Sequence, residues 1–433
     1  MVDVGAVAHG GFCVARHDGR AVFVRHALPG ERVRARVTEG GTDDRFWRAD
    51  AIEVLTASAD RVEAPCPYAR PGRCGGCDWQ HATLPAQRRL KAAVVAEQLR
   101  RLAGIERDVT VEAVSGDDDG LGWRTRVTYA VDAGGRAGLR QARSHDVVPI
   151  DTCLIAHPGV RGIRVEGHRW PGVAAVEAVA SGTGEQLVVV EPASSGSAGA
   201  ARPPRLPRLD PEVSVATVAS ASGAFTRVRG RSHVSEQAGG RTWRVTGGGF
   251  WQVHPGAADA LVAAVLAALE PRPGERALDL YCGVGLFAGA LAERVGAGGS
   301  VLGVEGSRQA VSDARRNLHD LPAVELVAGR VDRVLTGRRG DGASDRADVV
   351  VLDPPRTGAK AAVVGEVARR RPRAVAYVAC DPAALARDLA LFATHGYELT
   401  GLRAFDLFPM THHVECVATL TPAGAGNGTD IGS

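Results

Sequence analysis

The sequence predicts an α/β fold whose C-terminal half is a Rossmann-like domain built on a parallel sheet. Three short, mostly apolar runs support this prediction, because each stops abruptly at a residue that can take part in chemistry: Ala277-Leu-Asp-Leu-Tyr281, Val349-Val-Val-Leu-Asp353 and Val375-Ala-Tyr-Val-Ala-Cys380. Such runs are typical of strands that are buried on both faces of a parallel sheet. Since open α/β sheets build their sites at the carboxyl ends of the strands, the residues that follow are candidate functional residues.

The first run leads into a glycine-rich turn that is typical of nucleoside-cofactor sites. Gly283, Gly285 and Gly289 follow the predicted strand, and glycine lets a backbone turn and approach a ligand without Cβ clashes. A second predicted strand ends at Glu305, about 20 residues after Gly285, where dinucleotide folds place a carboxylate that binds ribose hydroxyls. The glycine spacing departs from the strict dinucleotide fingerprint and is closer to the pattern of S-adenosylmethionine enzymes.

The second run ends in the tetrapeptide Asp353-Pro-Pro-Arg356. Methyltransferases that modify amino groups have a similar tetrapeptide with an aromatic residue in last place, where this chain has Arg356. An arginine stays charged at any relevant pH and suits a phosphate or an anionic ring. The alternative is a proline-stiffened strand exit without a function, since proline restricts the preceding residue in any case.

Cys380 ends the third run, and a helix-compatible segment follows it. A thiol at the carboxyl end of a strand is a candidate nucleophile, although free cysteines are also common as small, inert core residues. Downstream, Glu415 ends the segment Thr-His412-His413-Val-Glu415. It is a candidate base, and the alternative is a surface carboxylate on a late strand.

A second group of thiols precedes the catalytic half. Cys66, Cys74 and Cys77 lie in a short loop rich in Gly and Pro, and Cys153 stands alone further along the chain. This arrangement fits either a zinc site or an iron–sulfur cluster with one distant ligand. Zinc ribbons usually supply a second Cys-x-x-Cys pair, which this chain does not have. Disulfides are the remaining alternative, in an oxidising compartment.

Together, these segments resemble the RNA uracil-5-methyltransferase family, which makes 5-methyluridine in ribosomal or transfer RNA with S-adenosylmethionine. The matching segments follow the family's order: Gly248-Gly-Phe-Trp-Gln252-Val, Asp279-Leu-Tyr281-Cys-Gly-Val-Gly285, Gly303-Val-Glu305-Gly, Asp353-Pro-Pro-Arg, Tyr377-Val-Ala-Cys380-Asp-Pro and Thr411-His-His-Val-Glu415-Cys. The chain departs from the pattern at three places. Asp381 stands where the family often has Asn, and Leu286 and Arg330 stand where some members have Asn residues in the cofactor pocket.

The resemblance implies a role for each matched residue. Cys380 would add to carbon 6 of the uracil, and Glu415 would remove the proton from carbon 5. The residues expected to bind S-adenosylmethionine are Gln252, Tyr281, Gly283, Gly285, Glu305 and Asp353. Members of the family that carry a cluster have the same cysteine arrangement, followed by a segment like Trp79-Gln-His81. The resemblance therefore implies a 4Fe–4S cluster, with a structural or RNA-positioning role, on Cys66, Cys74, Cys77 and Cys153.

Residues 1–58 predict a small β-barrel, because short apolar runs alternate there with regular turn signals. The segment around Gly30 resembles a TRAM domain, an RNA-binding barrel of the oligonucleotide-binding (OB-like) type. Arg32, Arg34 and Arg36 alternate along one predicted strand, so they share a face that could meet phosphates. A charged face that is merely solvated is the alternative.

The length of 433 residues predicts two or three domains, since single cores stop growing well below that size. We expect the barrel at 1–58, a central β-rich domain with the iron–sulfur cluster at 59–245, the methyltransferase domain at 246–422 and a disordered tail at 423–433. Composition also predicts a flexible loop at 193–204. A predicted helix at 84–102 could pack on the catalytic domain rather than on the cluster.

The expected partner is RNA, and the expected state is a cytoplasmic monomer. The net charge of +3 is too small to prove nucleic-acid binding, so any RNA-binding face must be local. The sequence shows no signal peptide or membrane span. The TRAM-like barrel and the four cysteines favour 23S ribosomal RNA as substrate, and transfer RNA is the alternative. A non-catalytic RNA-binding assembly factor would need neither Cys380 nor Glu415, and an amino-group methyltransferase is disfavoured by Arg356.

Overall fold

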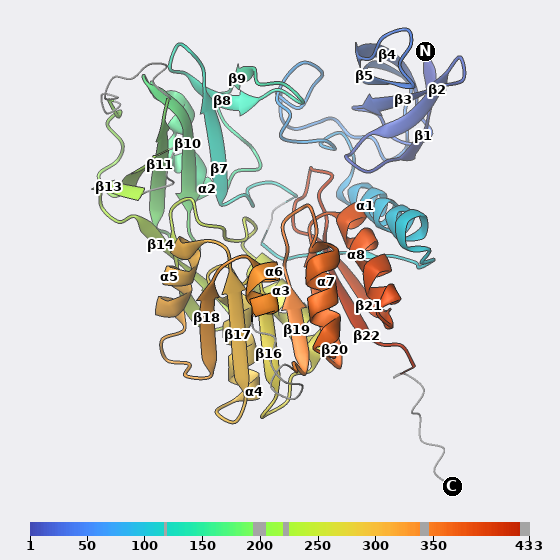
Figure 1. Ribbon diagram of the computed structural model, residues 1–433. Helices are drawn as coiled ribbons and strands as arrows, with labels where there is room; N and C mark the ends of the chain where they lie inside the picture. The colour runs from blue at the N-terminus through green and yellow to red at the C-terminus, as the bar shows by residue number, and fades with distance from the viewer. Residues whose placement is uncertain (117–118, 194–204, 220–224, 338–345, 425–433) are drawn as a thin grey trace.

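The computed structural model describes residues 1–116, 119–193, 205–219, 225–337 and 346–424. It consists of an N-terminal barrel, a central sheet and a C-terminal α/β domain, and the first two lie next to each other over the third (Figure 1). The expected loop at 193–204 and tail at 423–433 lie almost entirely outside the described residues. None of the described helices is long and apolar enough to cross a membrane.

The N-terminal unit is a small β-barrel, as the sequence predicts, and it is closed with the strand order β1-β2-β3-β5-β4. Its strands are β1 (Val2–Val7), β2 (Cys13–His17), β3 (Arg20–Arg25), β4 (Arg32–Glu39) and β5 (Phe46–Thr56). Side chains alternate between the two faces of each strand, so Val22 and Val24 of β3 are buried in the barrel core. On β4, the alternation leaves Arg32, Arg34 and Arg36 exposed on the outer face.

A cysteine-containing loop and a helix follow the barrel. The side chain of Thr83 accepts a hydrogen bond from the backbone of Ala86 and so caps α1 (Leu84–Gln98), which continues into the π-helical turn η1 (Leu99–Ala103). Both α1 and η1 pack against α8 of the catalytic domain. The next strand, β6 (Val111–Ala113), pairs in parallel with β21 at the edge of the catalytic sheet. The chain therefore joins the catalytic domain before it builds the central sheet.

The central sheet has seven strands in the order β13-β12-β11-β10-β7-β8-β9. The strands are β7 (Arg126–Val131), β8 (Ala137–Arg140), β9 (Val147–Pro149), β10 (Val173–Ala180), β11 (Gln186–Pro192), β12 (Ser214–Val218) and β13 (Phe225–Arg229). Helix α2 (Pro158–Ile163) and the 3-10 turn η2 (Val165–Gly167) complete the unit. Trp123, Tyr129 and Trp170 are buried in its core. Apart from the parallel pair β11–β12, neighbouring strands are antiparallel.

The catalytic domain is a doubly wound α/β domain, as the sequence predicts. A hairpin, β14 (His233–Ala238) and β15 (Arg241–Thr246), packs against it through α5. The other elements of the catalytic domain are α3 (Ala257–Leu269), β16 (Arg276–Leu280), α4 (Leu286–Val295), β17 (Ser300–Glu305), α5 (Arg308–Asn317), β18 (Val324–Ala328), α6 (Val331–Gly337), β19 (Val349–Leu352), α7 (Lys360–Arg369), β20 (Ala374–Ala379), α8 (Pro382–Thr394), β21 (Tyr397–Asp406) and β22 (Glu415–Pro422).

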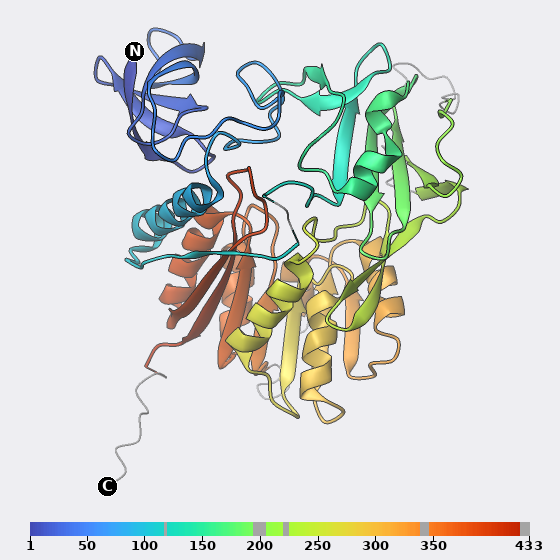
Figure 2. The same ribbon diagram turned by 180° about the vertical axis from the view of Figure 1, so that it is seen from behind.

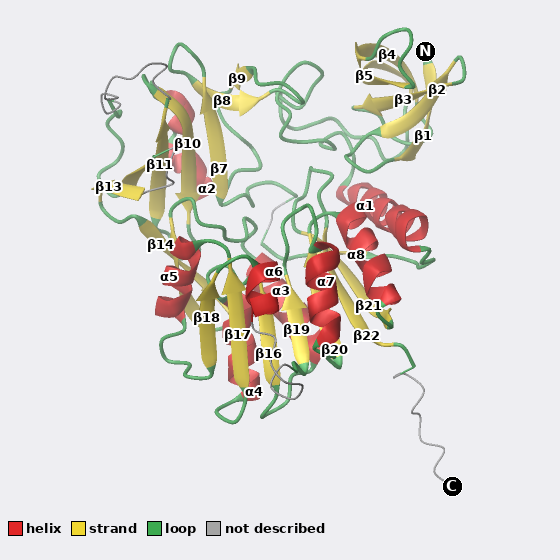
Figure 3. Cartoon of the chain, in the orientation of Figure 1, coloured by secondary structure: helices red, strands yellow, loops and turns green. Residues whose placement is uncertain are grey.

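The catalytic sheet has the strand order β18-β17-β16-β19-β20-β22-β21-β6. Helices α3 and α4 pack on one face, and α6, α7 and α8, with the end of α1, pack on the other, so each face has its own apolar core (Figures 1, 2 and 3). Every residue of β19 and β20 is buried, which explains why these strands read as unbroken apolar runs. The edge of this sheet where Cys380 lies faces the barrel. His9 Nε2 lies 3.3 Å from Oδ2 of Asp381, the residue that follows Cys380.

A buried ion pair ties α1 to the catalytic sheet. Lys91 Nζ lies 2.5 Å from Asp406 Oδ1 and 3.0 Å from the carbonyl of Phe408, and both charged side chains are essentially inaccessible to solvent. Burial lowers the pKa of Lys91, while Asp406 favours its charged form. A charge in such a position is tolerated only when it is paired and hydrogen-bonded. The ion pair therefore fixes the position of α1 relative to β21.

We predict that Lys91→Ala lowers the free energy of unfolding of the catalytic domain by about 3–5 kcal/mol, because it leaves Asp406 buried without its partner. Urea unfolding followed by circular dichroism would measure the loss. The matched control is Lys360→Ala, the other lysine of the chain, which is exposed. The double variant Lys91→Met/Asp406→Leu should recover most of the stability; a single variant as stable as the control would contradict the prediction.

Candidate active site

Four parallel strands end at one edge of the catalytic sheet, each with a residue that the sequence singles out. Tyr281 follows β16, Glu305 ends β17, Asp353 follows β19 and Cys380 follows β20. These strands are consecutive parallel neighbours in the order β17-β16-β19-β20. Parallel pairing therefore brings all four residues, which are far apart in the sequence, to the same edge.

The next strand runs in the opposite direction, and this brings Glu415 to the same edge. Strand β22 is antiparallel to β20, with Ala379 opposite Cys416. Glu415, the first residue of β22, therefore lies beside the end of β20, where Cys380 begins the turn into α8. Glu415 is only 3% exposed, whereas Cys380 is partly accessible. The predicted nucleophile and base are thus brought together by a strand reversal.

Burial favours the neutral forms of Cys380, Glu415 and Asp353 at this edge. Burial raises the pKa of Cys380 to about 12, Glu415 adds to the rise, and Arg356 opposes it. The pKa of Glu415 is also raised well above its usual value, first by burial and then by Asp353, again against Arg356. For Asp353, burial and the neighbouring Glu305 raise the pKa to about 7. Arg356 is thus the nearby cation that favours the charged forms of both Cys380 and Glu415.

The glycine turn after β16 has the backbone conformation that its glycines suggest. Gly283 and Gly285 have φ angles of 55° and 96°, in the left-handed region, and Tyr281 shares this conformation at 66°. A Cβ at Gly285 would lie 2.7 Å from Leu318 Cδ1, whereas a Cβ at Gly283 would meet nothing within 4 Å. Glu305 holds the turn, because its Oε2 accepts a hydrogen bond of 3.1 Å from the Gly283 amide.

Asp279, just before this turn, is a further residue of the edge that sequence reasoning does not select. It lies in β16, fully buried, and its Oδ2 accepts a 2.7 Å hydrogen bond from the Ala288 amide in the first turn of α4. Its Oδ1 is buried without a hydrogen-bond partner among the described residues. Burial raises the pKa of Asp279 to about 8. The signal in the sequence is an acid inside an otherwise apolar strand, directly before a glycine turn.

The structure also locates two of the positions where the chain departs from the family that it resembles. Leu286 is buried at the start of α4, and Arg330 is exposed and pairs with Asp332 at 2.9 Å. Gln252 is buried in the connection that leads to α3, and none of the described hydrogen bonds joins it to the strand-end residues. A groove of about 520 Å³ runs between the central sheet and the catalytic domain, and Val284 of the glycine turn and Ser307 line one end of it.

The four cysteines predicted to hold a cluster line one cavity of about 110 Å³. Cys66, Cys74 and Cys77 come from the loop after the barrel, and Cys153 comes from the central domain. All eight cysteines of the chain are free thiols, so the disulfide alternative is not observed. No three His, Cys, Asp or Glu side chains in the described ranges converge closely enough to hold a metal ion.

Burial favours the neutral thiol at Cys74, Cys77 and Cys153. Burial raises the pKa of Cys153 to about 11 and that of Cys77 well above its usual value. The amide of Gln80 donates a 3.1 Å hydrogen bond to Cys77 Sγ, and the Gly76 amide donates one of 3.3 Å to Cys74 Sγ. Hydrogen bonds that point at sulfur favour thiolates, which are the form that binds metal.

Comparison with known proteins agrees with this geometry. The sequence model of the tRNA (uracil-5-)-methyltransferases matches residues 236–422, and that of the TRAM domain matches residues 1–46. An uncharacterized RNA methyltransferase of Streptomyces avermitilis is 56% identical over 98% of both chains. Another, of Bifidobacterium longum, is 39% identical over 95% of this chain and 94% of its own.

Among solved structures, the tRNA (uracil-54, C5)-methyltransferase of Pyrococcus abyssi, in complex with S-adenosyl-L-homocysteine, matches with a TM-score of 0.69. The match covers 97% of this chain and 99% of that one at 24% sequence identity, which shows a shared fold. These matches confirm the family resemblance and the TRAM barrel. The chain therefore belongs to the RNA methyltransferase family, with an N-terminal TRAM domain and a C-terminal (uracil-5-)-methyltransferase domain.

Proposed function

We propose that this protein methylates carbon 5 of uridine in RNA, with S-adenosylmethionine as the methyl donor. The observation that carries the proposal is the juxtaposition of Cys380 at the end of β20 with Glu415 at the start of β22. Methylation of this carbon needs a nucleophile and a base, and a protein that only binds RNA needs neither. This observation therefore disfavours the non-catalytic assembly factor.

The chemistry explains why both groups are required. Carbon 5 of uracil is too poor a nucleophile to take a methyl group directly. In the proposed reaction, the Cys380 thiolate adds to carbon 6, and carbon 5 becomes the nucleophilic end of an enolate. Carbon 5 then takes the methyl group that S-adenosylmethionine would supply, and S-adenosylhomocysteine would leave with the electrons of the broken carbon–sulfur bond. The Glu415 carboxylate removes the carbon 5 proton, and the electrons of that bond restore the double bond as the Cys380 sulfur leaves.

The residues at the strand ends fit the methyl donor. Open space beside Gly283 lets a ligand approach the turn, and Glu305 at the end of β17 offers a carboxylate for ribose hydroxyls. Tyr281, Gly285, Asp353 and Gln252 are the other residues that we assign to this site. Buried acids such as Asp353 favour a cationic ligand, because a nearby positive charge stabilises the carboxylate form.

For the RNA, we favour 23S ribosomal RNA and treat transfer RNA as the alternative. The barrel, with its exposed arginines on β4, supports an extended RNA contact. Since carbon 5 must reach the recess between Cys380 and Glu415, the target uridine should be flipped out of a stack or taken from a loop.

We also propose that Cys66, Cys74, Cys77 and Cys153 hold a 4Fe–4S cluster. In such a cluster each cysteine binds a different iron, so the four sulfurs surround a volume instead of converging on one ion. This fits four cysteines that line one cavity without a site for a single metal ion among the described residues. The cluster would tie the loop after the barrel to the central domain.

Methylation can be tested with labelled S-adenosylmethionine and unmodified 23S ribosomal RNA fragments or transfer RNA, followed by nucleoside mass spectrometry. We expect 5-methyluridine in one of the two RNAs and none with Cys380→Ala. Glu415→Gln should also stop turnover, but it should leave a covalent protein–RNA complex, because addition and methyl transfer precede proton removal. Methylated adenine or cytosine amino groups as the product would contradict the proposal.

The cluster can be tested by anaerobic purification and iron and sulfide analysis. About four irons per chain are expected, and Cys77→Ser and Cys153→Ser should each lose most of them. Cys282→Ser is the control, because that thiol lies in the glycine turn and outside the cavity. A stoichiometric zinc content with no iron would contradict the assignment.

The raised pKa of Cys380 predicts slow alkylation of this thiol by iodoacetamide in the free protein. An acid with a pKa of about 12 is almost entirely neutral at pH 7, and its thiolate fraction rises about tenfold with each pH unit. The rate at Cys380, followed by peptide mass spectrometry, should thus rise steadily from about pH 7 to pH 9.5.

Arg356→Gln should lower this rate at every pH, since it removes the cation that favours the thiolate. Arg100→Gln, an exposed arginine on η1, serves as its control and should leave the rate unchanged. A plateau in the rate below about pH 9 would show instead that the free protein stabilises the thiolate.

A further inference from the structure

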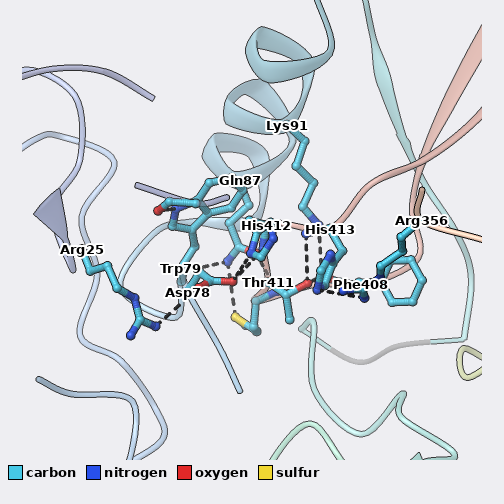
Figure 4. A network of polar contacts seen from close by, with 12 residues as sticks. Arg25, Asp78, Trp79, Gln87, Lys91, Arg356, Phe408, Thr411, His412 and His413 are labelled. Atoms are coloured by element: carbon cyan, nitrogen blue, oxygen red, sulfur yellow. Dashed lines mark hydrogen bonds and ion pairs between the residues drawn. The ribbon is translucent and has the colours of Figure 1, made fainter. Parts of the chain in front are cut away.

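The loop that leads to Glu415 is held by the N-terminal half of the chain. Residues 407–414 connect β21 to β22 without regular secondary structure, and Glu415 follows directly. Figure 4 shows that side chains of the barrel, the cysteine-containing loop and α1 surround this connection. The position of Glu415 therefore depends on contacts made by residues more than 300 positions earlier in the sequence.

Asp78, the residue after Cys77, makes the central contacts. Its Oδ2 lies 2.6 Å from His412 Nδ1 and accepts a second hydrogen bond of 3.0 Å from the His412 amide. Its Oδ1 lies 3.4 Å from Arg25 Nη2, on the barrel. The Asp78 side chain is 13% exposed. One carboxylate thus fixes both the backbone and the ring of His412, in a place where water competes little.

The same loop contains a strained backbone position that these contacts maintain. Met410 has a φ of 67°, in the left-handed region that side chains other than glycine rarely adopt. Its carbonyl accepts hydrogen bonds from the amides of Asp78 and Trp79, at 2.9 and 3.0 Å, and its amide donates one of 2.7 Å to Gln87 Oε1. Strain of this kind persists only where the surroundings over-determine it, and it gathers at functional sites.

The contacts continue from His412 into the active site. The rings of His412 and His413 lie 4.1 Å apart between centroids. Burial, followed by the neighbouring His412 and Arg356, lowers the pKa of His413 to about 3, so its ring is neutral. Arg356 Nη2 lies 3.4 Å from His413 Nε2, where a neutral ring nitrogen can accept from the guanidinium. Asp78 is therefore linked through two imidazoles to the cation beside Cys380 and Glu415.

From this geometry we propose that Asp78 is a positioning residue for Glu415, which it holds in place through His412 and the loop 407–414. The inference rests on the proposed function, in which Glu415 removes the carbon 5 proton. It goes further, because it assigns a catalytic consequence to a residue of the cysteine-containing loop, next to Cys77, that itself lies outside the strand-end site. The loop that would hold the cluster thus orients the base.

The test separates proton removal from the earlier steps. RNA that carries 5-fluorouridine has no carbon 5 proton, so the reaction stops as a methylated covalent adduct whose formation does not require the base. We expect Asp78→Ala to lower kcat on ordinary RNA by about 10- to 100-fold. KM for the RNA should stay within about twofold, and the rate of adduct formation within about threefold.

Four further variants sharpen the result. Asp78→Asn keeps an acceptor for the His412 amide and should restore most of kcat. His412→Ala should reproduce the loss without touching the cysteine-containing loop, and the double variant with Asp78→Ala should be no worse than either single variant. Asp60→Ala is the control, because its 2.6 Å ion pair with Arg89 on α1 is exposed and lies outside this set of contacts.

The outcomes are distinguishable. A wild-type protein that makes no 5-methyluridine would overturn the proposed function itself. If the wild type is active, an unchanged kcat in Asp78→Ala and His412→Ala would overturn the positioning role. A parallel fall of kcat and adduct formation in both variants would also overturn it, because that pattern reports a general loss of structure and not a displaced base. Iron content, measured for every variant, shows whether the cluster survives.

Discussion

The proposed active site depends on one reversed strand. Because β22 is antiparallel to β20, its first residue lies at the edge where the parallel strands end. A parallel β22 would place Glu415 at the opposite edge of the sheet. The ladder from Val375 opposite Leu420 to Ala379 opposite Cys416 also fixes the register, and a slip of one residue would turn Glu415 to the other face. The buried apolar side chains on both faces prevent such a slip, so the core specifies where Glu415, the proposed base, lies.

Burial at this edge also determines the pKa values of its ionisable groups. Cys380 and Glu415 have raised pKa values because they are recessed, and neighbouring acids add to the effect. The free protein therefore keeps these two groups largely neutral. The proposed chemistry needs them charged, and Arg356 favours their charged forms. Its position against His413 connects the electrostatics of the site to the loop that Asp78 holds.

The N-terminal half thus contributes contacts to the proposed site in addition to its TRAM domain. Lys91 and Gln87 of α1, together with Asp78, reach the segment from Asp406 to His412. These are buried or nearly buried polar contacts, and each is costly to leave unpaired. Such contacts make the relative position of α1 and the catalytic sheet specific, where apolar packing alone would tolerate small shifts.

The strand-end residues could be predicted from the sequence because their signal is local. Asp353 and Cys380 each follow a buried apolar run. Parallel pairing of the two strands then brings both residues to the same edge of the sheet. Contacts between distant segments have no such signal. Asp78 and His412 are 334 positions apart, and nothing in either segment indicates the pair. In the same way, β6 has only three residues, too few for a recognisable pattern, yet it extends the catalytic sheet beside β21.

The most direct test of the central claim is to locate the covalent bond between protein and RNA. The protein would be incubated with S-adenosylmethionine and RNA that contains 5-fluorouridine, digested, and mapped by mass spectrometry. The geometry predicts a methylated fluorouridine on the peptide that contains Cys380 and on no other cysteine peptide. An adduct on a different cysteine, or 5-methyluridine made from ordinary RNA without any adduct, would contradict the assignment of Cys380 as the nucleophile.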